Sequence, residues 1–222
     1  TLYFANGEFE YKGQWRKGVP QGQGMSYFAN GKPKYKGQWR KGVRDGQGTF
    51  FFNNGQFEYT GQWRKGVPHG EGTSYFANGQ LRYKGQWTKG VRNGQGTSFF
   101  DNGKVEYTGG FRGQQKYFGA WYLKHGWGAL YNQAGQLLYD GQWVQGDRAG
   151  LGASFQGTTL QYIGEWKRNK RHGYGESYGA DGELLYVGEW KRGREDGDGT
   201  SYDKSGQPLY EGQWKQGEYQ GV

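Results

Sequence analysis

The sequence repeats itself at a short, regular interval, and this limits what the chain can fold into. The segment Tyr11-Lys12-Gly13-Gln14-Trp15 recurs with small changes at residues 35–39, 59–63 and 83–87, a step of 24 residues. Weaker copies begin further along the chain, at Tyr107, Tyr117, Tyr139, Tyr162, Tyr186 and Tyr210. A unit of this length cannot bury a core of its own, so each copy must pack against its neighbours.

Each unit is predicted to form two β-strands joined by turns. Asn-Gly pairs stand at residues 6–7, 30–31, 54–55, 78–79 and 102–103. Because both central residues of a type I′ turn take positive φ, these pairs predict tight hairpin turns. The other end of each hairpin is predicted to be a longer turn, such as residues 16–21, where Pro20 lacks the donor that a strand would use.

Side-chain alternation divides the strands into two faces. In the first strand the alternation predicts a ring face made by Phe9, Tyr11, Gly13 and Trp15. The opposite face is predicted to be charged and is made by Glu10, Lys12, Gln14 and Arg16. In the next strand a Gly-x-Gly segment, residues 22–24, leaves gaps. The chain holds 46 Gly and is 19% aromatic, and rings that cover strand glycines compensate for the missing side chains. We therefore expect an aromatic core in which Tyr and Trp rings lie over glycines.

The pattern Tyr-x-Gly-x-Trp-x-x-Gly-x-x-x-Gly-x-Gly, seen for example from Tyr59 to Gly72, resembles the MORN (membrane occupation and recognition nexus) repeat. The resemblance covers nearly the whole chain. It implies an all-β fold, an elongated, solenoid-like antiparallel meander of tandem β-hairpins with a groove lined by aromatic residues. It also implies a role in protein–protein contact or in organising structures near membranes.

The period breaks between Tyr107 and Tyr139. Either residues 117–121 form an extra strand, which would reverse strand polarity downstream, or they lie in an eight-residue insertion that lengthens one unit. We favour the insertion because it preserves the meander. The segment is interpreted as a decayed repeat, with a kink or a partner-specific site as the alternative. The chain is predicted to be a single array over residues 1–222, regular over 1–106, irregular over 107–138 and regular over 139–222.

The leading functional hypothesis is a non-enzymatic structural or scaffold protein that binds a protein partner through its aromatic-lined surface. The candidate groove residues are Tyr11, Trp15, Tyr35, Trp39, Tyr59, Trp63, Tyr83, Trp87, Tyr117, Trp121, Tyr139 and Trp143. A role for these rings as plain core competes with a role in binding. Carbohydrate binding or stacking on single-stranded nucleic acid is a weaker alternative, and nucleic acid is not the expected partner.

A second hypothesis comes from charge. The net charge is +9, and 18 of the 29 Lys and Arg residues lie within residues 1–116, so the basic surplus is N-terminal. The candidate basic edge, from equivalent turns, consists of Arg16, Lys17, Arg40, Lys41, Arg64, Lys65 and Lys89. Such a ridge can hold the chain to an anionic membrane surface. A homodimer formed through an exposed terminal repeat is also considered.

Nothing in the sequence indicates an enzyme, a cofactor or a metal. The three histidines, His69, His125 and His172, fall in different units, and there is no cysteine. The Gly-x-Gly segments lack the third glycine and the following helix of a dinucleotide site. No segment has the pattern of a signal peptide or a transmembrane helix, which favours a cytoplasmic or membrane-peripheral location.

Overall fold

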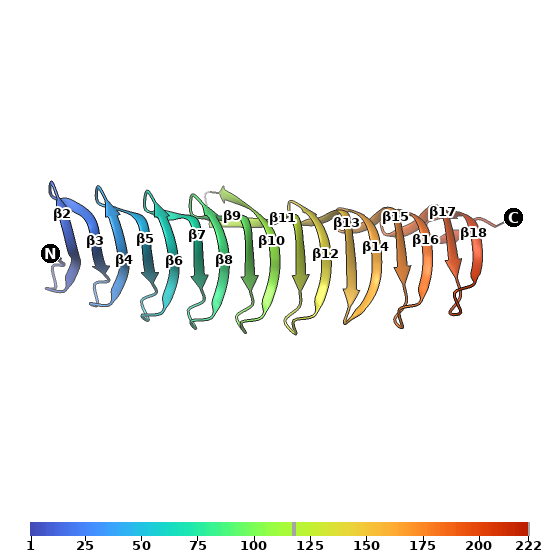
Figure 1. Cartoon of the computed structure of the whole chain (residues 1–222), viewed down its shortest axis with the longest axis horizontal. Helices are drawn as coiled ribbons and strands as arrows, with labels where there is room; N and C mark the ends of the chain where they lie inside the picture. Colours follow the sequence, from blue (N-terminus) through green and yellow to red (C-terminus); the bar gives the residue numbers. More distant parts are fainter. Residues whose placement is uncertain (117–118, 222) are drawn as a thin grey trace. The chain divides into compact units, whose positions relative to one another are not determined.

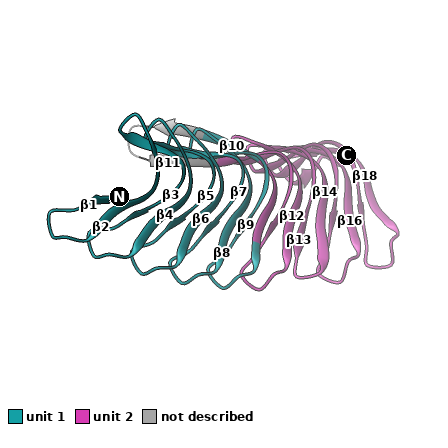
Figure 2. Cartoon of the chain, turned by 60° about the vertical axis from the view of Figure 1, so that its left-hand side comes forward, with its two compact units in different colours: residues 1–105, 111–122 teal, residues 106–110, 123–222 magenta. Residues whose placement is uncertain are grey.

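The computed structural model describes residues 1–116 and 119–221, with backbone only for residues 114–116 and 119–122. Across these residues the regular elements are β-strands, as the repeat pattern predicted (Figure 1). The chain divides into two compact units, one made of Thr1–Val105 with Phe111–Tyr122 and the other of Glu106–Gly110 with Leu123–Val222 (Figure 2). Whether the whole chain acts as a single array stays a prediction.

In each unit, successive strands pair antiparallel with the next strand along the chain. The first unit contains β1 (Leu2–Tyr3), β2 (Phe9–Arg16), β3 (Val19–Tyr27), β4 (Pro33–Arg40), β5 (Val43–Phe51), β6 (Phe57–Arg64), β7 (Val67–Tyr75), β8 (Leu81–Thr88) and β9 (Val91–Phe99). The second contains β12 (Leu137–Val144), β13 (Asp147–Gln156), β14 (Thr159–Lys167), β15 (Lys170–Tyr178), β16 (Leu184–Lys191), β17 (Arg194–Tyr202), β18 (Pro208–Lys215) and β19 (Glu218–Tyr219). The all-β meander of hairpins is confirmed.

The two kinds of turn are the reverse of the prediction. The tight two-residue turn is Lys17-Gly18, whose φ angles are 49° and 75°, and Arg16 pairs with Val19 across it. Both central residues have positive φ, as a type I′ turn requires. Equivalent lysines with φ near 50° stand at positions 41, 65 and 89.

The Asn-Gly pairs lie in a wider connection. Gly31 N–H donates to the Phe28 carbonyl over 2.9 Å, and Phe28 N–H donates to the Lys32 carbonyl over 2.8 Å. Only Gly31 of the pair has positive φ, 79°. Asn30 instead uses its side-chain oxygen to accept the Lys32 N–H at 3.2 Å. This is a type I turn followed by a glycine bulge, so the prediction of type I′ turns at Asn-Gly was wrong.

The placement of Pro20 in a long turn was also wrong. Pro20 lies one residue inside β3 and is paired with Trp15. Its carbonyl accepts the N–H of Gly42 in the next turn at 2.9 Å. Proline lacks a donor but keeps its acceptor, which is the group that this position uses.

The core has the predicted construction. The Tyr35 side chain is 0% exposed, and a methyl group added to Gly48 of the neighbouring strand would overlap the Tyr35 ring. The same relation recurs in the second unit between Tyr139 and Gly152. Glycine is therefore required at these positions because a ring occupies the space of its side chain.

The irregular segment is a lengthened pair of strands, β10 (Val105–Lys116) and β11 (Gly119–Tyr131). Downstream, Gly128 pairs with Gly141 of β12 just as Gly24 pairs with Gly37 of β4. The order of strand types is therefore unchanged after the irregularity, in agreement with an insertion and not with an extra strand that reverses polarity.

Candidate functional site

The tyrosine and tryptophan rings alternate along each unit in edge-to-face contact. The Tyr35 ring meets Trp39 of its own strand at 5.2 Å between centroids and 88°, and Trp63 of the next repeat at 5.3 Å and 82°. In the second unit Tyr162 meets Trp166 at 5.1 Å and Trp190 at 5.3 Å. Each of these tyrosines is held between two indoles, which couples one repeat to the next.

The polar ends of these rings are satisfied within the chain. The Tyr35 hydroxyl donates to the Gln38 carbonyl at 3.1 Å, and Trp63 Nε1–H donates to the Gly48 carbonyl at 3.1 Å. Trp190 and Gly175 repeat the indole bond at 3.0 Å in the second unit. Burial without a partner would cost free energy, so these bonds are part of the core.

Burial also changes the acidity of the tyrosines. Desolvation raises the pKa of Tyr35, Tyr83 and Tyr139 to about 12, against an ordinary value of 10.0 for tyrosine. The hydroxyls are neutral near pH 7 and serve as hydrogen-bond donors rather than as acids.

The structure brings the predicted groove residues onto one face within each unit, but it buries many of them. Tyr11, Tyr35, Tyr59, Tyr83, Tyr139, Trp63 and Trp143 are buried, Trp39 and Trp87 are half-buried, and Trp15 is 38% exposed. Tyr117 and the Trp121 side chain lie outside the described residues. The rings are thus chiefly the floor of this face, which we call the inner face, and a role of these residues in binding stays a prediction.

Arginines that the sequence reasoning missed lie above this floor. The Arg44 guanidinium lies 4.5 Å from the Trp63 centroid and 4.9 Å from that of Phe50, and Arg148 lies 4.3 Å from Trp166. Burial lowers the pKa of Arg44. The repeat position of Arg44 could have revealed it. Arg44 occupies in its repeat the place that Pro20 has in the first one, paired with the tryptophan of the neighbouring strand.

A bulge adds further charges to the inner face. Ser26 pairs with Tyr35 and Tyr27 with Pro33, so Lys34 is an extra residue in β4. Such a bulge re-aims a side chain. In the first unit the residues at this position, which we call the bulge residues, are Glu10, Lys34, Glu58 and Arg82.

These bulge residues line depressions together with the rings. One depression of about 340 Å³ is lined by Glu58 and Arg82 with Tyr59 and Trp87 among others. Another contains Glu10 and Lys34 beside Tyr35, Trp39 and Phe50. The assignment of Glu10 to the face opposite the rings was therefore wrong. Strict alternation fails there because the partner strand sets the register.

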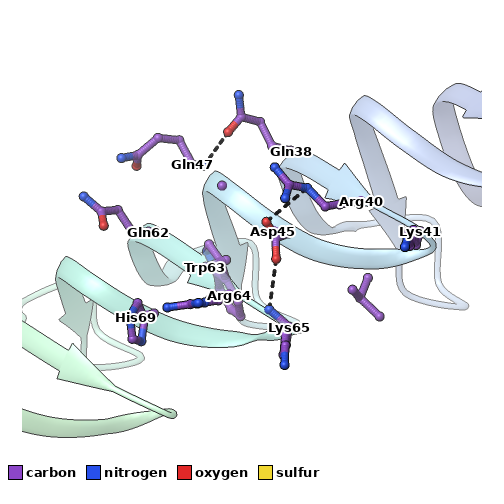
Figure 3. Close-up of a pocket in the computed structure, with 12 residues that line it drawn as sticks. Gln38, Arg40, Lys41, Asp45, Gln47, Gln62, Trp63, Arg64, Lys65 and His69 are labelled. Atoms are coloured by element: carbon purple, nitrogen blue, oxygen red, sulfur yellow. Dashed lines mark hydrogen bonds and ion pairs between the residues drawn. The ribbon is translucent and has the colours of Figure 1, made fainter.

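The predicted basic edge is a row of turns within the first unit. Gly42 N–H donates to the Pro20 carbonyl and Gly66 N–H to the Arg44 carbonyl, each at 2.9 Å, so successive turns are tied together. Figure 3 shows a depression of about 590 Å³ along this row, lined by Arg40, Lys41, Arg64 and Lys65 among others. The depression also contains a carboxylate.

That carboxylate, Asp45, offsets part of the positive charge. It forms an ion pair with Arg40 at 3.6 Å and accepts the Lys65 backbone N–H at 3.2 Å. The second unit has a comparable basic row that the sequence reasoning missed, because the summed charge of that half hides it. A depression of about 740 Å³ there is lined by Lys167, Arg168, Lys170, His172, Lys191 and Arg192.

Within the described part of the chain, His, Asp and Glu side chains form no group that could hold a metal ion. Over the same residues there is no helix of the length and hydrophobicity needed to cross a bilayer.

Sequence comparison agrees with this repeat geometry. A model of the MORN repeat matches residues 11–32, 35–57, 59–81, 83–105, 139–153 and 162–183, and a model of a MORN repeat variant matches residues 195–216. A comparison with curated proteins gave no match. The matched segments make up more than half of the sequence and coincide with the Tyr-Gly-Trp hairpins described above. The chain belongs to the MORN repeat family.

Proposed function

We propose that this protein is a non-enzymatic scaffold whose inner face in the first unit binds a protein partner. The observation that carries the proposal is the pair of depressions in which charges of both signs stand over a floor of rings. Protein interfaces are enriched in Tyr, Trp and Arg, and their binding energy is concentrated at such residues. The floor is rigid because its rings are packed and hydrogen-bonded.

The charged layer supplies selectivity. Burial raises the pKa of Glu58, and the nearby positive charges of Arg82 and Arg44 offset part of this rise. A partner segment that replaces these interactions must place a positive charge opposite Glu58 and negative charges opposite Arg44 and Arg82. Partners whose charges have another order would place like charges together and bind less well.

Site-specific photo-cross-linking in an extract of the native source tests this proposal. A photoreactive amino acid in place of Glu58 reports on the inner face, and the same group in place of exposed Lys84, in β8 of the following repeat, is the matched control. We expect a protein adduct at position 58 that is lost when Arg82→Glu is added. Equal adducts at the two positions, or none at position 58, would contradict the proposal.

A second candidate function is binding to an anionic membrane through the basic edge. The observation in its favour is the ladder of hydrogen bonds that holds the lysine turns in one row. Vesicles containing phosphatidylserine should sediment the chain at low salt and release it at high salt. Lys17→Asn, Lys41→Asn and Lys65→Asn together should abolish sedimentation, because they remove three positive charges from the edge. The turns should keep their conformation, because Asn tolerates positive φ.

The matched control for the membrane test neutralises Lys12, Lys36 and Lys84, which are exposed lysines of the strands. Loss of sedimentation in this control as well would show general electrostatics rather than a membrane-binding edge. Dimerisation through a terminal repeat is a separate proposal, tested by light scattering. A monomer at high concentration would remove it.

A further inference from the structure

The second unit exposes a row of large apolar side chains on the face opposite the rings, which we call the outer face. Trp127, Leu151 and Tyr174 are 58%, 55% and 58% exposed. Each is the middle residue of a Gly-x-Gly segment, so the three recur once per hairpin. We call them the apolar stripe. Ile163, on the strand between Leu151 and Tyr174, is also exposed, at 45%.

The fold does not require apolar residues at these positions. In the first unit the middle residue of the Gly-x-Gly segment is polar and exposed in every regular hairpin: Gln23, Gln47, Glu71 and Gln95. In the second unit the same position is apolar in three hairpins and polar in the last one, where Asp198 lies between Gly197 and Gly199. The same backbone is thus built with either kind of residue. Contiguous exposed apolar groups mark interaction sites.

Acidic residues accompany the stripe. Leu151 pairs with Glu165 and Tyr174 pairs with Glu189. Each carboxylate accepts a backbone N–H, from Tyr174 at 3.0 Å and from Asp198 at 3.2 Å, and both side chains remain exposed. The first unit uses neutral Gln14 and similar glutamines for this bond. The negative charge is therefore not needed for the backbone contact.

The spacing of the stripe selects the conformation of a partner. Two strands about 4.8 Å apart make each hairpin about 10 Å wide. An α-helix advances about 10.5 Å in seven residues and returns to the same face, and about 4.5 Å in three residues, close to one strand spacing. An extended strand advances about 10 Å in three residues but then presents its opposite face.

We propose that the apolar stripe and its two glutamates bind an amphipathic α-helix of a protein partner. The helix carries an apolar side chain at every seventh position and Lys or Arg three residues after each one. Its apolar residues contact Trp127, Leu151 and Tyr174, and its cations meet Glu165 and Glu189. The same carboxylates repel an anionic lipid surface, which argues against membrane insertion of the stripe. This site is independent of the inner face.

A designed peptide tests the proposal against the full chain. The probe is a fluorescein-labelled, alanine-rich 21-residue peptide with Leu at the first and Lys at the fourth position of each heptad. Fluorescence anisotropy should show saturable binding and circular dichroism a gain of helix. Trp127→Gln, Leu151→Gln and Tyr174→Gln together should weaken binding by about tenfold or more, because exposed aromatic anchors dominate such contacts.

Two further variants separate the charges and the fold from the contact. Glu165→Gln with Glu189→Gln keeps the backbone bond that glutamine makes in the first unit, and should weaken the Lys peptide but not a Leu-only peptide. Transplanting the site by Gln23→Trp, Gln47→Leu, Glu71→Tyr, Gln62→Glu and Gln86→Glu into the triple-Gln chain should restore binding.

Three results with peptides would overturn the proposal: binding that the triple-Gln change leaves intact, equal binding of a peptide with the same residues in shuffled order, and tighter binding of a proline-rich peptide with Leu at every third position. Sedimentation with anionic vesicles that depends on the stripe would overturn it too. A dimer that the triple-Gln change dissociates would also overturn it, by assigning the stripe to a second copy of the chain.

Discussion

The indole N–H of Trp63 donates a hydrogen bond to the carbonyl of Gly48 in the preceding repeat, at 3.1 Å. Gly48 is also the residue whose missing side chain makes room for the Tyr35 ring. One glycine thus accommodates a ring from one neighbouring strand and accepts a hydrogen bond from the other. This relation recurs from repeat to repeat and joins the hairpins of each unit.

Trp63→Phe removes the indole donor while keeping an aromatic ring. The Gly48 carbonyl loses its side-chain partner, and the free energy of unfolding should fall by about 1–2 kcal/mol. Urea denaturation followed by circular dichroism measures the change. Trp15→Phe is the control, because Trp15 is partly exposed, and a larger loss there than at position 63 would contradict the role of the bond.

Gly48→Ala should destabilise the chain by about 2 kcal/mol or more, because the added methyl overlaps the Tyr35 ring. Gly55→Ala is the comparison. Gly55 has open space around it but a φ of 91°, so its cost is backbone strain of about 1 kcal/mol. If thermal unfolding shows the Gly55 change to be the more damaging, the ring does not occupy the glycine gap.

Lys65 tests the assignment of the tight turn. Its φ is 50°. Lys65→Asn should therefore preserve or raise the melting temperature. Lys65→Val should lower the melting temperature, with a loss of about 1 kcal/mol or more in the free energy of unfolding. Asn54→Val should carry no penalty from positive φ, since Asn54 is not among the residues with positive φ. Differential scanning calorimetry of these variants decides between the two turn assignments.

The buried tyrosines predict an alkaline limit to stability. The pKa of Tyr35, Tyr83 and Tyr139 is raised to about 12 in the folded chain, above the value of 10.0 for an unperturbed phenol. Their contribution is therefore fully present below pH 10 and is lost as the pH rises from 10 through 12. Tyrosinate absorbance should rise at higher pH in the folded chain than in urea. Coincident titrations would contradict burial of the hydroxyls.

Much of the fold could be predicted from the sequence because the repeat and the alternation of side chains are local properties. The ring face follows from the order Tyr11, Gly13, Trp15, and the glycine gaps follow from the Gly-x-Gly segment of the next strand, residues 22–24. The turns could not be assigned in this way, because Lys-Gly and Asn-Gly both place glycine where positive φ is needed. The side chain of Asn30 then stabilises a type I turn rather than type I′.

The functional surface was harder to predict for a related reason. Lys34 turns toward the rings because its strand has one residue more than its partner, and a bulge is a property of a strand pair. The outer stripe was visible in the sequence as Trp127, Leu151 and Tyr174 between glycines. It becomes informative only when these positions are known to be exposed.

A double-mutant cycle on Tyr35 and Trp63 measures most directly whether rings couple successive repeats. Unfolding free energies of Tyr35→Leu, Trp63→Leu and the double variant should give a coupling energy of about 0.5–1.5 kcal/mol, as expected for an edge-to-face pair in contact. Tyr35 and Trp166, in different units, should be additive in the same measurement. A coupling of zero between Tyr35 and Trp63 would contradict the account.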